Sequence, residues 1–196
     1  MQLFHNDAVQ LMIGFLETYP NSTLYDEASK RIADYYYQKR DYKNAVLYYE
    51  TVDISQLRKK DIAKYKFQYA YSLFEIGEMK SAASFFHDLI SKGADYKNQA
   101  SYYFGYIAYI DGNYATAKQY FLELLEQAMY VDELPLYVVQ IYHHQKAYEE
   151  LIEFALPYSC QSSPASYEMY KLIAEAYYHL KDYEAAVSFF QDKYLA

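Results

Sequence analysis

Apolar residues recur along the chain at intervals of three and four, the spacing of an α-helix that buries one face. The first such stretch runs from Asn6 to Thr18 and carries Ala8, Leu11, Met12, Phe15 and Leu16. Tyr19-Pro20 ends this predicted helix, because proline cannot continue one. Thr23, with Asp26 three residues later, predicts a capping box at the start of the next helix.

The helical pattern then repeats. Pairs of small residues 12 apart mark each unit: Ala33 and Ala45, Ala70 and Ala82, Gly105 and Ala117, Ala174 and Ala186. Their first members are separated by steps of 37, 35 and 69 residues, and the last step spans two units. Val139 and Leu151, also 12 apart, hold the place of the missing pair. The pattern indicates a repeat protein in which each helix pair packs only on its neighbours.

The segment from Lys97 to Gln127 shows the unit most clearly. Two helical patterns meet there at the turn Asp111-Gly112-Asn113, and the small Gly105 and Ala117 allow their backbones to approach closely. In the fourth unit Val139 opposite Leu151 is bulkier, and close-packed interiors do not absorb added methylene groups freely. We therefore expect the helix pair Asp132–Gln145 and Tyr148–Leu156 to be splayed or shorter than its neighbours.

These spaced positions resemble the tetratricopeptide repeat family over nearly the whole chain. The family's small, aromatic, alanine and aromatic positions are all matched by Ala174, Tyr177, Ala186 and Phe190. Gly105, Ala108, Ala117 and Phe121 match them with a small residue in the first aromatic position. The family's early tryptophan is replaced by Ser29, Lys66, Ser101, Pro135 and Tyr170, and its late proline is met only by Pro20. The resemblance implies an all-α fold, an α-solenoid wound as a right-handed superhelix of about 11 helices.

We expect residues 1–196 to form a single solenoid of this kind. Its parts are a half repeat at 6–20 and repeats at about 26–59, 63–96, 98–131, 132–163 and 167–196. The pattern opens and closes on the second helix of a repeat, at Asn6–Thr18 and Tyr183–Leu195, and solenoids need polar ends to stay soluble. The chain is therefore expected to be a segment of a longer protein, or to self-associate through its uncapped ends.

The run from Phe15 to Ser22, followed by Ala28, is similar to tetratricopeptide proteins of the bacterial cell envelope. That similarity implies the periplasmic side of the envelope, with a signal or anchor outside this segment. A cytoplasmic location is the alternative. The N-terminus lacks a basic region and carries Asp7 early, so it is not a signal peptide. No apolar run approaches the ~20 residues that span a bilayer, so direct membrane insertion is not expected.

Composition excludes several classes of protein. A hydrophobic content of 53% excludes a disordered chain, and few glycines (5) and prolines (4) suit helices joined by short turns. The formal net charge of −8 argues against a nucleic-acid partner, which needs a clustered excess of Lys and Arg. The one dense basic run, Arg58-Lys59-Lys60, is followed directly by Asp61.

No group of residues predicts catalysis. His143-His144 are adjacent, and neighbours on a helix point about 100° apart, so they do not chelate a metal as an i, i+4 pair would. Cys160 has no histidine at a spacing that predicts a catalytic dyad. Glu149-Glu150 and Asp132-Glu133 lie at helix starts, where the helix dipole favours acids. We expect no enzyme, no metal site and no cofactor.

The most unusual count is 29 tyrosines, beside 11 phenylalanines. In the family that the chain resembles, the first helix of each repeat lines a concave groove through its fifth and ninth positions. Here these would be Lys30 and Asp34, Phe67 and Tyr71, Tyr102 and Tyr106, Leu136 and Gln140, and Lys171 and Glu175. The lysine and asparagine with which some members clamp a peptide carboxylate do not combine at these positions.

In the second and third repeats the fifth, ninth and twelfth positions are all aromatic. Spacings of four and three put each trio on one helix face, apart from the residues expected to form the repeat's own core. The predicted partner-binding groove consists of Phe67, Tyr71, Phe74, Tyr102, Tyr106 and Tyr109. Alternatively, these rings pack against the first helix of the adjoining repeat.

The expected function is a protein–protein interaction scaffold that binds a peptide or protein segment in this groove. Two alternatives remain: a sugar- or small-ligand-binding module, because tyrosine rings suit sugar faces, and a structural spacer within a larger envelope protein. The sequence does not identify the partner.

Overall fold

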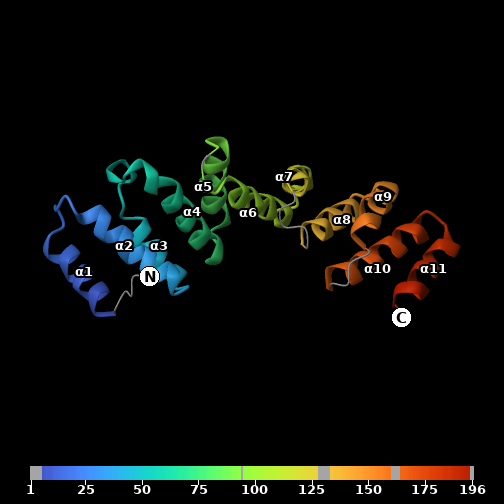
Figure 1. Ribbon diagram of the computed structural model, residues 1–196, viewed down its shortest axis with the longest axis horizontal. Coiled ribbons are helices and arrows are strands. Elements are labelled where there is room, and N and C mark those ends of the chain that lie inside the picture. Colours follow the sequence, from blue (N-terminus) through green and yellow to red (C-terminus); the bar gives the residue numbers. More distant parts are fainter. Residues whose placement is uncertain (1–5, 94, 128–132, 160–163, 195–196) are drawn as a thin grey trace. The chain divides into compact units, whose positions relative to one another are not determined.

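The computed structural model describes residues 6–93, 95–127, 133–159 and 164–194. Within these residues the chain forms eleven α-helices and one 3-10 helix, η1 (Ile54–Gln56), and no strand (Figure 1). The α-helices are α1 (Asn6–Thr18), α2 (Tyr25–Gln38), α3 (Tyr42–Tyr49), α4 (Lys59–Glu75), α5 (Met79–Ser91), α6 (Lys97–Ile110), α7 (Tyr114–Glu126), α8 (Leu134–His144), α9 (Tyr148–Ser159), α10 (Pro164–His179) and α11 (Tyr183–Tyr194). The all-α class and the number of helices expected from the sequence are confirmed.

Contacts along the chain divide it into two compact units, Met1–Ile107 and Ala108–Ala196, with the boundary inside α6. In the first unit α2 packs on α3 and α4 packs on α5. In the second unit α8 packs on α9 and α10 packs on α11. Each of these pairs is a helix–turn–helix repeat, and α1 packs on α2 as the additional helix before the first repeat.

Small residues lie in the core where the two helices of a repeat meet. Ala33 and Ala45 of the first repeat, like Ala70 and Ala82 of the second, are fully buried in one hydrophobic cluster. A methyl group at these positions leaves room for the backbones to approach, and the larger apolar side chains fill the space on either side.

The fourth repeat buries its bulkier pair and has a shorter first helix. Val139 and Leu151 are fully buried in the core of the second unit. Helix α8 is 11 residues long, against 14 for α6 and 16 for α10, so the first helix of the pair is shorter than its neighbours, whereas α9 with 12 residues is as long as α11. Helix α9, expected to end at Leu156, continues to Ser159. Asp132, the expected start of the pair, lies outside the described residues.

The capping box predicted at Thr23 is wrong. The residue that precedes α2 is Leu24, and its side chain makes no capping bond. The Asp26 carboxylate instead accepts a hydrogen bond from the backbone N–H of Asp53, 2.7 Å away, in the segment between α3 and η1. The Asp26 side chain, which local spacing predicted to cap the start of α2, therefore makes a tertiary contact with Asp53.

Each described turn between the two helices of a repeat contains one residue in the left-handed region. These residues are Arg40, Gly77, Gly112, Lys146 and Lys181, with φ between 57° and 88°. They occupy the same place in successive repeats, so the turn geometry repeats with the helices. Glycine adopts this conformation without a Cβ clash, whereas other L-residues pay roughly 1 kcal/mol or more.

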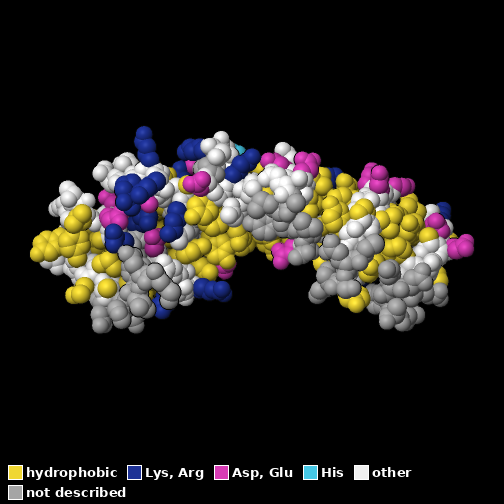
Figure 2. Space-filling model, in the orientation of Figure 1, with side chains coloured by type: hydrophobic (Ala, Val, Ile, Leu, Met, Phe, Trp, Pro, Cys, Tyr) yellow, Lys and Arg dark blue, Asp and Glu magenta, His cyan; other side chains and the backbone are white. Residues whose placement is uncertain are grey.

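Charge is distributed unequally between the two units. The first unit carries 13 Lys and Arg beside 13 Asp and Glu, whereas the second carries 5 and 13. The whole formal net charge of −8 therefore belongs to the second unit. On the face shown in Figure 2, most Lys and Arg side chains lie over the first unit. None of the described helices has the length and apolar character needed to span a bilayer.

Gly77→Ala is expected to lower the free energy of unfolding by about 1 kcal/mol. An added Cβ meets no atom within 4 Å, so the loss comes from the φ of 88° alone. Gly14 offers a matched control, because its Cβ position is equally open but lies within helix α1. Gly14→Ala should stabilise by up to about 1 kcal/mol. Urea unfolding followed by circular dichroism measures both, and equal shifts of the same sign would contradict the turn geometry.

Ala82→Leu is expected to lower the free energy of unfolding by about 1–3 kcal/mol, because the fully buried methyl group leaves no room for three more carbons. Ser84→Leu on the exposed side of the same helix is the control and should change stability little. The same unfolding measurement compares them. A core that tolerates Ala82→Leu as well as Ser84→Leu would show that the helices of the second repeat are not closely packed at this point.

Candidate functional site

The tyrosine-rich region of the first unit is organised around Tyr71 on α4. Its ring centroid lies 5.1 Å from that of Tyr103, 5.6 Å from Tyr42 and 5.9 Å from Tyr37, each in an edge-to-face arrangement. Phe67 and Phe74, one turn of α4 on either side, lie 6.4 and 6.3 Å away. Such distances and angles are those at which aromatic rings attract one another beyond simple burial.

Tyr103 on α6 connects this cluster to the buried core. Its ring stacks on the fully buried Phe86 at 5.4 Å and also contacts Phe67 and Phe74 at 6.2 and 5.2 Å. Phe67 in turn stacks on Tyr96 at 4.9 Å. Contacts with Phe86 and Tyr96 therefore hold the rings of Tyr103 and Phe67 in place, as a preformed binding surface requires.

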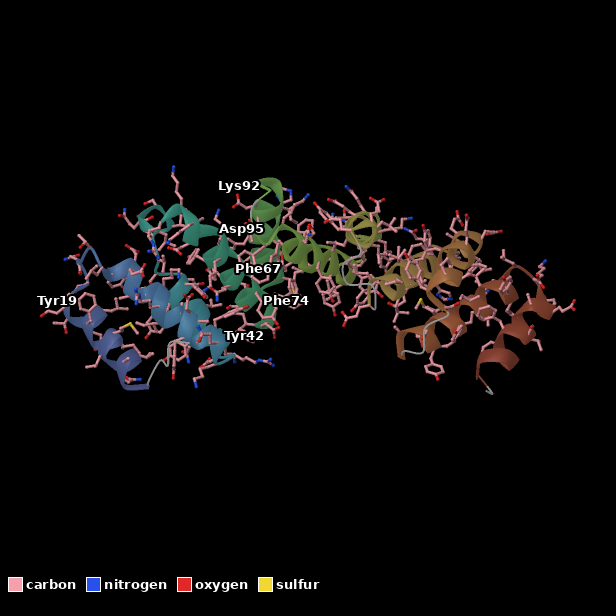
Figure 3. The ribbon with its side chains drawn as sticks, viewed as in Figure 1. Tyr19, Tyr42, Phe67, Phe74, Lys92 and Asp95 are labelled. Atoms are coloured by element: carbon pink, nitrogen blue, oxygen red, sulfur yellow. The ribbon has the colours of Figure 1, made fainter. Side chains whose placement is uncertain are left out.

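A pocket of about 430 Å³ opens beside these rings. Its lining comes from the end of α2, the following turn, the start of α3, and from α4 and α6: Tyr37, Gln38, Arg40, Tyr42, Phe67, Tyr71 and Tyr103. Figure 3 shows Tyr42, Phe67 and Phe74 in this part of the first unit. Ring faces supply apolar contact, while the amide of Gln38, the guanidinium of Arg40 and the tyrosine hydroxyls supply polar groups.

The hydroxyls of Tyr37 and Tyr71 are neutral at physiological pH. Burial raises the pKa of Tyr37 to about 12, and its neighbours Tyr42 and Tyr103 add to the rise. Burial also raises the pKa of Tyr71, and the nearby Glu75 adds to it. A protonated phenol can donate a hydrogen bond, so the pocket combines neutral donors with the cation of Arg40.

The structure brings together five of the six residues predicted for the groove. Phe67, Tyr71, Phe74, Tyr102 and Tyr106 all belong to the first unit and are half-buried. Phe74 lies 5.9 Å from Tyr106, and Tyr102 stacks on Tyr106 at 6.4 Å.

The sixth, Tyr109, belongs to the second unit. Its hydroxyl donates to Gln140 at 2.9 Å, and its ring contacts Tyr114 and Tyr137. We therefore treat it apart from the pocket of the first unit.

Sequence reasoning missed five residues of the pocket: Tyr37, Gln38, Arg40, Tyr42 and Tyr103. Tyr37 occupies the same repeat position as Phe74 and Tyr109, so the pattern used for those two could have found it. Tyr42 is the aromatic turn residue that recurs in several repeats. Tyr103 has no such signal, because Gln68 and Arg31 hold its place in the preceding repeats.

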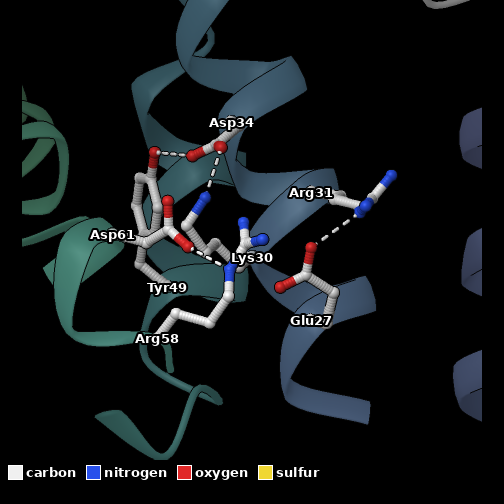
Figure 4. A network of polar contacts seen from close by, with 7 residues as sticks. All are labelled: Glu27, Lys30, Arg31, Asp34, Tyr49, Arg58 and Asp61. Carbon is white, nitrogen blue, oxygen red and sulfur yellow. Dashed lines mark hydrogen bonds and ion pairs between the residues drawn. The ribbon is translucent and has the colours of Figure 1, made fainter. Parts of the chain in front are cut away.

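The groove positions expected in the first repeat, Lys30 and Asp34, do not line an open surface. They are 8% and 9% exposed and form an ion pair at 2.8 Å (Figure 4). The other oxygen of Asp34 accepts a hydrogen bond from the fully buried Tyr49, also at 2.8 Å. The carbonyl of Tyr49 accepts from the hydroxyl of Tyr65. A buried charge pair needs such additional partners, and Tyr49 supplies one from the second helix of the repeat.

Other candidates from the sequence take structural positions. His143 lies 3.2 Å from Glu175, and His144 stacks on Tyr114 at 5.1 Å. Over the described part of the chain no three His, Cys, Asp or Glu side chains gather as metal ligands would. Cys160 lies outside the described residues.

The repeated helix pairs, their left-handed turns and their small core residues define a tetratricopeptide repeat fold. No protein-family profile matches the sequence, and no curated protein matches it. Solved structures do match the fold. MamA AMB-1 aligns with a TM-score of 0.73 at 13% identity, covering 87% of this chain and 90% of that chain.

Two further solved structures align over most of this chain. YrrB, described as a TPR protein with an unusual peptide-binding site, aligns with a TM-score of 0.67 at 11% identity, covering 94% of this chain and 91% of that chain. A tetratricopeptide repeat protein from Parabacteroides merdae aligns with a TM-score of 0.61 at 16% identity, covering 96% of this chain and 72% of that chain. At these identities the likeness establishes the fold alone.

The buried Tyr49 should make stability fall steeply in alkali. Burial raises the pKa of Tyr49 well above its usual value, and Asp34 adds to the rise. Above about pH 10 the unfolded chain releases this proton and the folded chain keeps it, so the free energy of unfolding falls by about 1.4 kcal/mol per pH unit from this residue. Below that pH both states are protonated and Tyr49 contributes no pH dependence.

Urea unfolding between about pH 8 and pH 11, compared with Tyr49→Phe, measures this contribution. Other buried tyrosines affect both proteins alike, so the difference in slope reports Tyr49. If the free energy of unfolding fell equally steeply with pH in wild type and in Tyr49→Phe above about pH 10, the folded protein would have to ionise this residue.

Proposed function

We propose that the chain is a protein-interaction scaffold whose first unit binds a peptide or protein segment. The pocket beside Tyr71 receives an apolar or aromatic side chain of that segment, and Tyr102 and Tyr106 extend the contact along α6. One observation carries the proposal: a pocket of about 430 Å³ bordered by half-buried rings, one of which, Tyr103, stacks on the fully buried Phe86.

Three further points support this proposal. The tetratricopeptide repeat fold presents side chains from successive first helices on one surface. In this chain the pocket is lined from two such helices, by Phe67 and Tyr71 of α4 and by Tyr103 of α6. Aromatic side chains in concave positions are also the residues that dominate binding energy at protein interfaces. YrrB, which shares the fold, is described as having a peptide-binding site.

A small polar ligand such as a sugar is the second candidate. The lining of the pocket favours it, because Gln38, Arg40 and several tyrosine hydroxyls surround the rings. Sugars bind by placing an apolar face on an aromatic ring while their hydroxyls find hydrogen-bond partners at its edge. The same pocket serves either ligand, so the experiment has to separate them.

A random peptide library displayed on phage and selected on the purified protein tests the scaffold directly. Selected peptides are expected to share an aromatic or large apolar residue and to lose about 2 kcal/mol, roughly thirtyfold in affinity, against Tyr71→Ala. Tyr71→Phe keeps the ring and should bind nearly as well. Titration calorimetry with the synthetic peptides measures the affinities, and circular dichroism confirms that each variant is folded.

The control is Tyr167→Ala, which removes a tyrosine that is 57% exposed on α10, outside the first unit. It should leave peptide affinity unchanged. Peptides that bind Tyr71→Ala and wild type equally would refute the pocket as the site. No enriched peptide, together with glycan-array binding that Tyr71→Ala abolishes, would favour the sugar-binding module instead.

A further inference from the structure

Arg40 is the one charged side chain among the described residues that line the pocket beside Tyr71. It lies in the turn between α2 and α3 and is exposed, whereas the rings of Tyr37, Tyr42 and Tyr71 are half-buried, so the cation lies at the mouth of the pocket. We infer that Arg40 selects the segment that the pocket binds, by pairing with an aspartate or glutamate side chain beside the segment's aromatic or apolar anchor. This inference rests on the function proposed above and names the chemistry of the partner.

The Arg40 guanidinium is available for such a pair. Within the described residues no ion pair or side-chain hydrogen bond uses it. The neighbouring carboxylate, that of Asp41, is already bonded: one oxygen accepts from the backbone N–H of Asn44 at 3.3 Å and the other from the Asn44 side-chain amide at 2.7 Å. Asp41 thereby caps the start of α3. An arginine without an internal partner can bind both oxygens of an incoming carboxylate.

The charges around the pocket determine where the acid of the ligand lies. Lys39 and Lys43 flank Arg40 in the sequence, and both are exposed. On α4, burial raises the pKa of Tyr71, and Glu75, one turn further along the helix, adds to the rise. A second carboxylate beside Glu75 would be repelled, whereas a carboxylate at the turn meets three cations. The acid of the ligand therefore lies at the turn while its ring enters the pocket.

The turn position of Arg40 also has a role at the end of the helix. The same position holds Gly77 and Gly112 in the second and third repeats, and Lys146 and Lys181 in the last two. A basic residue suits it because the helix dipole favours cations at a C-terminal end. Arg40 shares that role and in addition lines the pocket. The two roles can be separated, because lysine keeps the charge but lacks the planar pair of donors that matches a carboxylate.

The geometry of the pocket favours a side-chain carboxylate over the carboxylate of a chain terminus. Proteins that capture a chain terminus surround it with several converging donors. Here the turn supplies one guanidinium and the amide of Gln38, both exposed at an open edge. Tyr102 and Tyr106 continue the aromatic surface along α6, so it offers contacts to residues of the segment beyond the anchor.

Selection from a peptide library whose members are fused to the phage coat protein through their C-termini tests this inference, because such peptides have no free terminal carboxylate. Peptides selected on wild type should carry aspartate or glutamate beside their aromatic residue more often than the unselected library. Selection on Arg40→Gln should lose that excess. Aromatic peptides without an excess of acids would overturn this inference and leave the proposed function intact. A selection that yields no peptide would overturn both.

Synthetic copies of the strongest acidic peptide, with amidated C-termini, give the affinities by titration calorimetry. Replacing the acid of the peptide by its amide, or Arg40 by Gln, should each weaken binding about threefold to tenfold. Making both changes should cost little more than making either one, because the two groups act as a pair. Arg40→Lys should keep part of the preference for the acid. Arg40→Glu should reverse it, so that this variant binds a lysine-substituted peptide better than the acidic one.

The matched control is Arg58→Gln, which removes the same charge from the first unit at a side chain that is 66% exposed and does not line the pocket. It should leave peptide affinity unchanged. An effect as large as that of Arg40→Gln would show a general attraction of acids to the first unit and overturn the inference. So would an Arg40→Glu variant that still prefers the acidic peptide. If Arg40→Gln weakens only peptides with a free C-terminal carboxylate, the partner group is a chain terminus and the side-chain assignment is wrong. Circular dichroism establishes that the variants are folded.

Discussion

The close approach of two helices within each repeat is the constraint on which the rest of the structure depends. Ala33 with Ala45 and Ala70 with Ala82 are fully buried and keep the crossing free of bulk, so the two backbones can approach there. Where Val139 and Leu151 replace the small pair, the first helix is shorter. The small residues therefore leave the space on either side of the crossing to the rings and larger apolar chains.

Tyrosine suits the space that this arrangement leaves between repeats. The gap between neighbouring first helices is wide enough for a ring, and its edge is close enough to water for a hydroxyl. Tyr49 is fully buried and donates a hydrogen bond from its hydroxyl to Asp34. Tyr71 is half-buried and packs against other rings. A phenylalanine-only interior would fill the same volume but would leave Asp34 with one partner fewer, and an unpaired buried carboxylate oxygen is costly.

The sequence was sufficient for the helices, their pairing and the rings of Phe67, Tyr71 and Phe74, because these follow from local spacing. Periodicity located the helices within a few residues, and the 12-residue pairs located the crossings. What failed depended on contacts between distant segments. Asp26 was assigned to a helix cap but bonds to Asp53, and Lys30 with Asp34 was assigned to an open groove but is covered by Tyr49. Nothing in the spacing of α2 reveals which side chain of α3 will lie on it.

The pocket itself illustrates the same limit. Phe67 and Tyr71 were predicted because they follow the repeat pattern. Arg40, in contrast, comes from the turn between α2 and α3, and Tyr103 comes from the first helix of the third repeat. A site assembled from three repeats combines positions that no single repeat marks as special. The repeat pattern can therefore locate the surface, but its shape depends on residues that differ between repeats.

The unequal charge of the two units has a consequence for how the protein behaves at charged surfaces. A protein whose net charge lies in one part of its chain has a permanent dipole moment, so an electric field orients it as well as moving it. On a positively charged resin or membrane the second unit makes the attachment, and the pocket-bearing first unit contributes little to the retention. Added salt would then release the protein by screening that one unit, while the aromatic surface of the other is left unaffected.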